Sequence, residues 1–256
     1  MTMPKAVLID IDGVLTISWR PIPGAVQALA CLRDMGMAVK LLTNTTSRTR
    51  AEIAARLLDA GFDISPGDIL TAPTATASYL AARYPEARCA LLNSGDIRDD
   101  LPGVQLVEDD PDVLVVGGAG PEFSYEAVNR AFGDLQRGAR LVAMARNLCW
   151  RTAQGLQLDG GAFLLGLERA AGVEAEVVGK PAAAFFQTAL DMLAVRPEET
   201  VMIGDDVEAD VLAAQRCGIT GVLVRTGKYL PRDETASPAP DHIIDSFSNL
   251  PVLLSG

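Results

Sequence analysis

The sequence predicts an α/β protein built on a mostly parallel sheet. Short apolar runs typical of buried strands alternate with helical patterns along the 256 residues, and this alternation favours βαβ units. Hydrophobic residues make up 49% of the chain and charged residues 21%, a composition that can form a substantial globular core. Aspartates directly follow two of the apolar runs. Because ligands in open α/β sheets bind beyond the carboxyl ends of the strands, we expect a ligand site there.

The first part of the chain predicts two strands, each followed by a helix. Ala6–Asp10 begins with four apolar residues, which is typical of a strand covered on both faces. A helix is expected near Gly24–Met35 and a second strand over Ala38–Thr43. Ser47 or Thr49 is expected to cap the helix that follows this strand.

The middle of the chain restarts the alternation. Its apolar runs and helical patterns predict three strands and two helices. The strands are expected at Cys89–Asn93, Val113–Val116 and Arg140–Met144, and the helices at Ser124–Arg137 and Gly161–Ala171.

The last part of the chain returns to the pattern of the first. Lys180 stands between a glycine and a proline, at the entry of a helix that runs to about Leu193. The apolar run Val201–Ile203 predicts a strand, which is followed by a helix near Asp210–Cys217 and a strand over Ile219–Val224.

These elements predict two domains. A core with a Rossmann-like, doubly wound, mostly parallel sheet is expected from both ends of the chain, residues 1–77 and 177–256. A smaller α/β domain over residues 78–176 is expected to be inserted into it. The boundaries are placed where the alternation restarts.

Charge and cysteine content exclude several classes of function. A net charge of −11 argues against non-specific binding to nucleic acid or to an anionic membrane surface. We see no secretory signal pattern and no apolar run long enough to span a bilayer. The four cysteines show no paired spacing, which indicates reduced thiols in a cytoplasmic protein.

Asp10 and Asp12 are the most informative residues of the chain. They stand at the end of a predicted buried strand, where a carboxylate is costly unless a cation or hydrogen-bond donors compensate it. Three further groups belong with them. These are Thr43-Asn44-Thr45 at the end of the second strand, Lys180, and Gly204-Asp205-Asp206 with Asp210 shortly after.

Together these groups suit phosphoryl transfer. An aspartate can attack a phosphoryl group and form an aspartyl-phosphate. Mg²⁺ and a lysine can neutralise the repulsion between carboxylate and phosphate, and carboxylate-rich sites suit Mg²⁺. A second aspartate two residues on can protonate the leaving oxygen and later activate water.

The four groups resemble, in order and spacing, the motifs of the haloacid dehalogenase superfamily of phosphohydrolases. Asp10-Ile11-Asp12-Gly13-Val14-Leu15 resembles the first motif, Thr43 the second and Lys180 the third. The fourth motif is matched by Gly204-Asp205-Asp206 with Asp210. The resemblance covers nearly the whole chain.

The resemblance implies a role for each of these residues. Asp10 would be the nucleophile and Asp12 the general acid and base. Mg²⁺ would be held by Asp10, Asp205 and the backbone carbonyl of Asp12. Thr43 and Lys180 would bind phosphate, with Asn44, Thr45 and Asn147 as further substrate-binding residues. Asp206 or Asp210 would hold metal-bound water in the outer shell.

Within the superfamily, the chain looks like the class with a large α/β cap between motifs two and three. Four stretches carry this likeness, namely Arg20–Ala25, Leu42–Thr46, Ala213–Gly218 and Val224–Tyr229. Members of the class often form homodimers through the cap. The substrate that the resemblance implies is a small phosphorylated compound, with pyrophosphate, phospholysine or phosphohistidine as candidates.

Two other functions remain open on the sequence. A phosphotransferase or mutase would use Asp10 in the same way but pass the phosphoryl group to another acceptor. A non-catalytic protein that binds phosphorylated ligands could share the fold. Catalysis by histidine is disfavoured, because the single histidine, His242, lies in a predicted edge strand with no nucleophile near it in sequence. Thr226-Gly227-Lys228 lacks the upstream glycine of a phosphate-binding P-loop.

Overall fold

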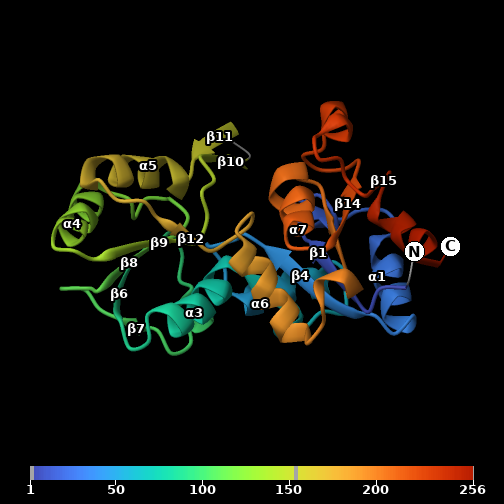
Figure 1. Cartoon of the computed structure of the whole chain (residues 1–256), viewed down its shortest axis with the longest axis horizontal. Coiled ribbons are helices and arrows are strands. Elements are labelled where there is room, and N and C mark those ends of the chain that lie inside the picture. Colours follow the sequence, from blue (N-terminus) through green and yellow to red (C-terminus); the bar gives the residue numbers. More distant parts are fainter. Residues whose placement is uncertain (1–2, 153–154, 256) are drawn as a thin grey trace. The chain divides into compact units, whose positions relative to one another are not determined.

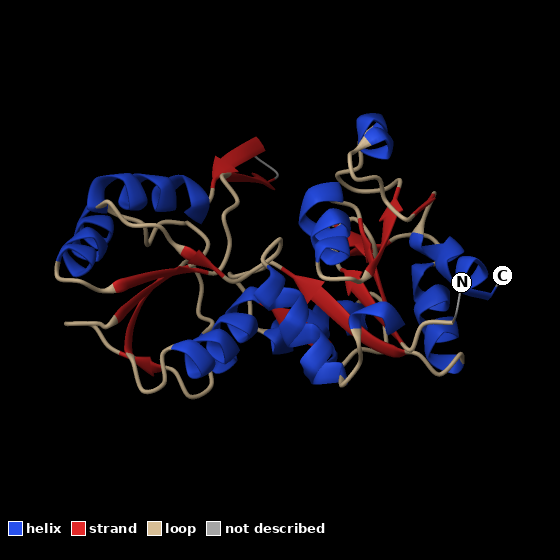
Figure 2. Ribbon diagram, in the orientation of Figure 1, coloured by secondary structure: helices blue, strands red, loops and turns tan. Residues whose placement is uncertain are grey.

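The computed structural model describes residues 3–152 and 155–255. It confirms the α/β class, with two mainly parallel sheets and helices packed on them (Figures 1 and 2). The chain forms two compact units. Unit 1 consists of Met1–Thr43, Arg50–Leu70 and Lys180–Gly256, and unit 2 consists of Asn44–Thr49 and Thr71–Gly179.

The sheet of unit 1 has six strands. Their order is β15 (His242–Ile244), β14 (Thr220–Val224), β13 (Thr200–Gly204), β1 (Ala6–Asp10), β4 (Ala38–Thr43) and β5 (Ile69–Thr71). The chain winds outward from β1 through β4 to β5, and then from β13 on the other side of β1 to β15. The reversal of strand order falls between β1 and β13, which is where ligands bind in doubly wound sheets.

Helices cover both faces of this sheet. They are α1 (Ala25–Asp34), α2 (Arg50–Asp59), α6 (Ala183–Leu193), α7 (Ala213–Arg216) and α8 (Leu250–Ser255). Val7 and Ile9 of β1 pack into a cluster with residues of α1, α2 and α8. Ala6 and Leu8 point to the opposite face and are also fully buried. Burial on both faces explains the uninterrupted apolar run of β1. A short hairpin, β2 (Thr16–Ile17) with β3 (Arg20–Pro21), follows β1.

The main sheet of unit 2 has five strands. Their order is β12 (Glu176–Val177), β9 (Arg140–Ala143), β8 (Val113–Val116), β6 (Arg88–Leu92) and β7 (Gln105–Leu106). Helices α4 (Tyr125–Gln136) and α5 (Gly160–Ala171) pack on one face around a shared apolar cluster. Figure 1 shows α3 (Ala72–Arg83) on the opposite face. A separate antiparallel pair is formed by β10 (Cys149–Thr152) and β11 (Gly155–Leu158).

The two units divide the chain at positions that differ from the expected boundaries. The boundary expected at 77/78 falls inside α3, which runs unbroken from its cap at Thr71. The boundary expected at 176/177 falls inside β12, and unit 2 ends three residues later, at Gly179. The observed changes of unit lie near these elements, at Leu70/Thr71 and at Gly179/Lys180. None of the helices in the described part of the chain has the length and apolarity needed to cross a bilayer.

Candidate active site

The carboxyl ends of β1 and β13 bring four charged side chains of unit 1 together. Asp10 is the last residue of β1, and Asp205 follows β13 directly. Lys180 lies shortly before α6, and Asp210 lies in a π-helical segment, Val207–Leu212, that follows Asp205. All four residues are buried. The structure thus places side chains from three of the four predicted motifs side by side.

Lys180 links two of the carboxylates. Its Nζ donates to Asp10 Oδ1, and also to Asp210 Oδ1 at 2.7 Å. The three side chains are only 4%, 11% and 2% exposed for Lys180, Asp10 and Asp210. Burial alone would lower the pKa of Lys180, but the charges of Asp10 and Asp210 outweigh it and raise the pKa above its ordinary value. Lys180 therefore carries a positive charge at the end of β1.

The start of the π-helical segment is fixed by Asp206 and Asp210. Asp206 caps it, because its Oδ1 accepts from the backbone N–H of Ala209 at 3.0 Å. Asp210 Oδ2 accepts from the backbone N–H of Asp206 at 3.3 Å. Since both oxygens of Asp210 accept from protein donors, this carboxylate holds Lys180 and the loop after β13 in place.

The charge of the cluster fits a divalent cation. Burial raises the pKa of Asp10, Asp205 and Asp210 to about 6 in each case, and nearby carboxylates add to the rise. Among the described residues, Lys180 is the cation that pairs with this buried group. Lys228 also acts on Asp10 and Asp205, but it forms its ion pair with Asp206. Four carboxylates against two ammonium groups leave a negative excess that a divalent ion would neutralise.

Ligand atoms for such an ion are present. Oxygens of Asp10, Asp205 and Asp210 lie within 4.8 Å of one another. Asp205 Oδ1 is buried, and within residues 3–152 and 155–255 no donor reaches it. A buried oxygen of this kind is costly unless something binds it. An all-oxygen carboxylate set suits a hard cation such as Mg²⁺.

The remaining predicted residues lie in both units. In unit 1, Asp12 is exposed in the loop after β1, and Thr43 is buried at the end of β4. Asn44, Thr45 and Asn147 belong to unit 2. Asn147 is exposed, and its backbone carbonyl accepts from the N–H of Gly161 at 3.0 Å.

Trp19, whose role the sequence leaves open, packs against the core of unit 1. It lies beside the apolar cluster formed by α1, α2 and β1. The guanidinium of Arg56 stands 5.1 Å from the centre of its ring, which is a cation–π arrangement. These contacts give Trp19 a packing role.

Sequence reasoning missed one contact of the cluster and one groove. The backbone N–H of Lys228 donates to Asp205 Oδ2 at 2.7 Å. A main-chain donor leaves no residue-type signal, so spacing alone could not have found it.

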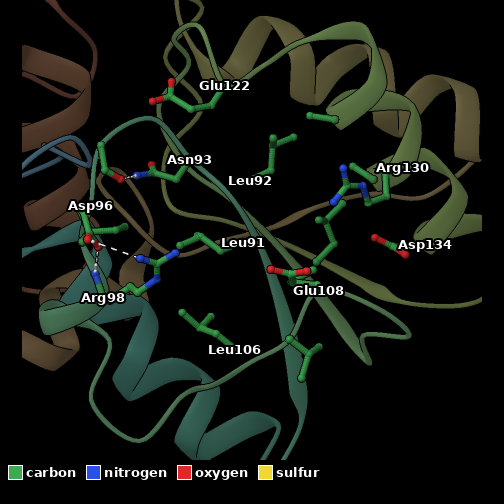
Figure 3. A pocket seen from close by; sticks show the side chains of 17 residues that line it. Leu91, Leu92, Asn93, Asp96, Arg98, Leu106, Glu108, Glu122, Arg130 and Asp134 are labelled. Carbon is green, nitrogen blue, oxygen red and sulfur yellow. Dashed lines mark hydrogen bonds and ion pairs between the residues drawn. The ribbon is translucent and has the colours of Figure 1, made fainter.

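The groove lies in unit 2, where β6, β7 and α4 surround about 620 Å³ (Figure 3). Leu91 and Leu106 line it together with Arg98, Arg130 and Glu108. It contains none of the predicted site residues.

Nearly the whole chain is similar in sequence to known proteins. Residues 7–107 match the family described as haloacid dehalogenase-like hydrolase, and residues 177–250 match a related HAD-hydrolase-like family. The haloacid dehalogenase-like hydrolase domain-containing protein 2 of Bos taurus is 40% identical over 244 residues, 95% of this chain and 93% of that protein. The phospholysine phosphohistidine inorganic pyrophosphate phosphatase of Xenopus laevis is 39% identical over 254 residues, 96% and 91% of the two proteins.

Solved structures share the fold over nearly the whole chain. The p-nitrophenyl phosphatase from Archaeoglobus fulgidus superposes with a TM-score of 0.91 at 28% identity, covering 98% of this chain and 99% of that one. The glycerol phosphate phosphatase from Mycobacterium tuberculosis, solved in complex with magnesium, gives a TM-score of 0.87 at 27% identity, covering 97% and 76%. The phosphatase class predicted from the motifs is thereby confirmed. With a buried aspartate–lysine cluster at the strand ends and relatives of this identity and coverage, the chain belongs to the haloacid dehalogenase-like hydrolases.

Proposed function

We propose that this phosphatase hydrolyses small phosphorylated compounds through an aspartyl-phosphate on Asp10, with Mg²⁺ as its cofactor. The observation that carries the proposal is the contact between Lys180 and Asp10 at the end of β1. The ammonium group of Lys180 thereby places a positive charge beside the Asp10 carboxylate, which would attack an anionic phosphoryl group. Lys180 would offset the repulsion between the two anions as the new bond forms.

The chemistry divides into two steps that this chain's residues can perform. In the first, a carboxylate oxygen of Asp10 attacks phosphorus, the bond to the leaving oxygen breaks, and Asp12 supplies the proton that this oxygen takes up. In the second, Asp12 accepts a proton from water, whose oxygen attacks phosphorus and releases phosphate and free Asp10. Asp12 is exposed in the loop after β1, so its carboxyl group can exchange protons with solvent.

Mg²⁺ would be held by Asp10, Asp205 and the backbone carbonyl of Asp12. Bound there, it would supply charge neutralisation for the phosphoryl oxygens. The unsatisfied Asp205 Oδ1 supports this assignment, as does magnesium in the related glycerol phosphate phosphatase structure. Thr43 would bind phosphate beside Lys180. Asp206 and Asp210 would act from the outer shell, Asp210 by holding Lys180.

We further propose that unit 2 acts as the cap and selects the leaving group. Asn44, Thr45 and Asn147 would contribute to substrate binding from this unit. Pyrophosphate and N-phosphorylated amino acids are the favoured substrates, because the name of the related Xenopus laevis phosphatase includes both kinds of compound. The glycerol phosphate and p-nitrophenyl phosphate named for the structural relatives extend the set to be tested.

Phosphate release across a substrate panel tests the proposed function. The panel contains pyrophosphate, phospholysine, phosphohistidine and small phosphomonoesters, each with Mg²⁺ and with EDTA. We expect release with Mg²⁺ and its loss in EDTA. Transfer of phosphate to an added alcohol or amine in place of release would indicate a phosphotransferase. Tight binding of these compounds without turnover would indicate a binding protein.

We propose a homodimer that forms through unit 2. Helices α4 and α5 carry an exposed apolar hollow of about 340 Å³ that is lined by Tyr125, Val128, Phe132, Phe163 and Leu167. Tyr125 is 80% exposed, Val128, Phe132 and Phe163 are half-buried, and Leu167 is buried at the base of the hollow. An apolar hollow of this kind on the surface suits association with another apolar surface. We expect Phe132→Asp to give a monomer by analytical ultracentrifugation at a concentration where the unmodified protein is a dimer. An unmodified protein that sediments as a monomer would contradict this proposal.

A further inference from the structure

A turn after β14 reaches the same carboxylate cluster. It consists of Thr226, Gly227 and Lys228 and is closed by a hydrogen bond from the N–H of Tyr229 to the carbonyl of Thr226 at 3.2 Å. Its main contact is the N–H of Lys228, which donates to Asp205 Oδ2 at 2.7 Å. The turn therefore holds one of the two oxygens of Asp205 from the main chain.

Two glycines enclose that same oxygen. A Cβ built on Gly13 would lie 1.9 Å from Asp205 Oδ2, and one built on Gly227 would lie at the same 1.9 Å. Both glycines have positive φ angles, +90° and +61°, which residues with a side chain rarely adopt. Only glycine lets the two backbones approach the carboxylate this closely, so the position of Asp205 depends on both.

The hydroxyl of Thr226 fixes the turn to the loop that carries Asp12. It donates to the backbone carbonyl of Gly13, and the N–H of Gly13 in turn donates to the carbonyl of Thr16 at 2.7 Å. The loop after β1 and the turn after β14 are thus held against each other, with Asp205 between them. Strands β1 and β14 each lie beside β13 in the sheet, which explains how loops so far apart in sequence meet.

These contacts leave one oxygen of Asp205, Oδ1, available to a ligand. With Oδ2 held by Lys228 and enclosed by two glycines, the other oxygen of Asp205, Oδ1, is buried and has no donor within the described chain. Fixing one oxygen of a carboxylate fixes the direction of the other. We propose that the turn Thr226–Lys228 is a positioning element that orients Asp205 Oδ1 toward the cation site. The proposal rests on the proposed function, because it assumes that a divalent cation binds Asp205.

The side chain of Lys228 contributes less than its backbone to the positioning of Asp205. Its Nζ lies 3.3 Å from Asp206 Oδ2, and the side chain is 67% exposed. An exposed ion pair of this kind adds little stability. The positioning is therefore expected to come from the backbone N–H and from the two glycines, more than from the ammonium group.

Calorimetric titration with MgCl₂, without substrate, tests the proposal. We expect Gly227→Ala to weaken Mg²⁺ binding about 10- to 100-fold, the range for residues that orient metal ligands. Gly36→Ala is the matched control. Gly36 also has a positive φ, +79°, but a Cβ there meets nothing within 4 Å, so this variant carries backbone strain without touching Asp205. Asp205→Asn shows the effect of weakening the ligand itself.

Two further variants separate the parts of the turn. Thr226→Val removes the hydroxyl but keeps the shape of the side chain, and it is expected to weaken Mg²⁺ binding even if Gly227→Ala proves poorly folded. Lys228→Met keeps the backbone N–H and is expected to weaken binding less than Gly227→Ala does.

The outcomes distinguish this proposal from the proposed function. Wild-type Mg²⁺ affinity in both Gly227→Ala and Thr226→Val, with weakened binding in Asp205→Asn, would overturn the positioning role and leave the metal site standing. Equal weakening in Gly36→Ala and Gly227→Ala would also overturn it, because strain alone would then explain the loss. An unmodified protein that binds no Mg²⁺ would overturn both proposals.

Discussion

Asp10→Asn is expected to abolish phosphate release while leaving the protein folded. The amide is not a nucleophile, so the aspartyl-phosphate cannot form. We expect kcat to fall roughly 10⁴-fold or more, as for other enzymes that lose their nucleophile. The amide oxygen can still accept the hydrogen bond that Lys180 now donates to Asp10 Oδ1, so the thermal unfolding midpoint is expected to change little. Phosphate release and circular dichroism melting measure the two effects.

The control for this variant is Asp63→Asn, which makes the same chemical change at a fully exposed side chain. It should release phosphate at the unmodified rate. Substantial turnover by a pure Asp10→Asn preparation would show that another group attacks phosphorus, and the mechanism built on Asp10 would have to be abandoned.

Lys180→Met is expected to remove activity and to destabilise the fold as well. The ammonium pairs with Asp10 and Asp210 inside the protein. Its loss leaves two buried carboxylates without their partner, which costs about 3–5 kcal/mol of unfolding free energy. Chemical denaturation in EDTA measures this cost without a contribution from bound metal. Activity is expected to stay lost with excess Mg²⁺, because the phosphoryl group loses the positive charge beside Asp10.

Lys5→Met provides the comparison for this variant. Lys5 also forms an ion pair, 2.7 Å from Glu199, but its side chain is 68% exposed, so its removal should cost less than about 1 kcal/mol. If Lys180→Met were no less stable than Lys5→Met, the buried ion pairs would not be what holds the cluster together.

Strands with a strong apolar signal could be predicted from the sequence at their observed limits. The predicted strands Ala6–Asp10, Ala38–Thr43 and Val113–Val116 coincide with β1, β4 and β8. Helix α3 was missed, because alanine and threonine fill it and most of its length is buried, so no polar face marks a helical period. The short strands β7 and β12 have two residues each, too few to show an alternation.

For the candidate site, the residues that the sequence suggests are those whose residue type carries the chemistry. Asp10 and Asp205 follow apolar strands and Lys180 stands at a helix entry, and these three side chains lie close together in the structure. The pairing of Asp210 with Lys180 depends on a π-helical segment, which has no clear sequence signal. The contact of Lys228 with Asp205 uses the main chain, so only the three-dimensional structure reveals it.

The strand order of unit 1 has a consequence for synthesis of the protein on the ribosome. Lys180 meets Asp10 across 170 positions of sequence, and β1 pairs on one side with β13, which is made only after all of unit 2. Until then, the backbone of β1 is unpaired on the side that later meets β13, and its apolar side chains are only partly covered. The nascent chain also has no complete site. We therefore expect the growing polypeptide to be most prone to aggregation while unit 2 is being translated. A chain that terminates before β13 should be inactive, and should depend on chaperones to remain in solution.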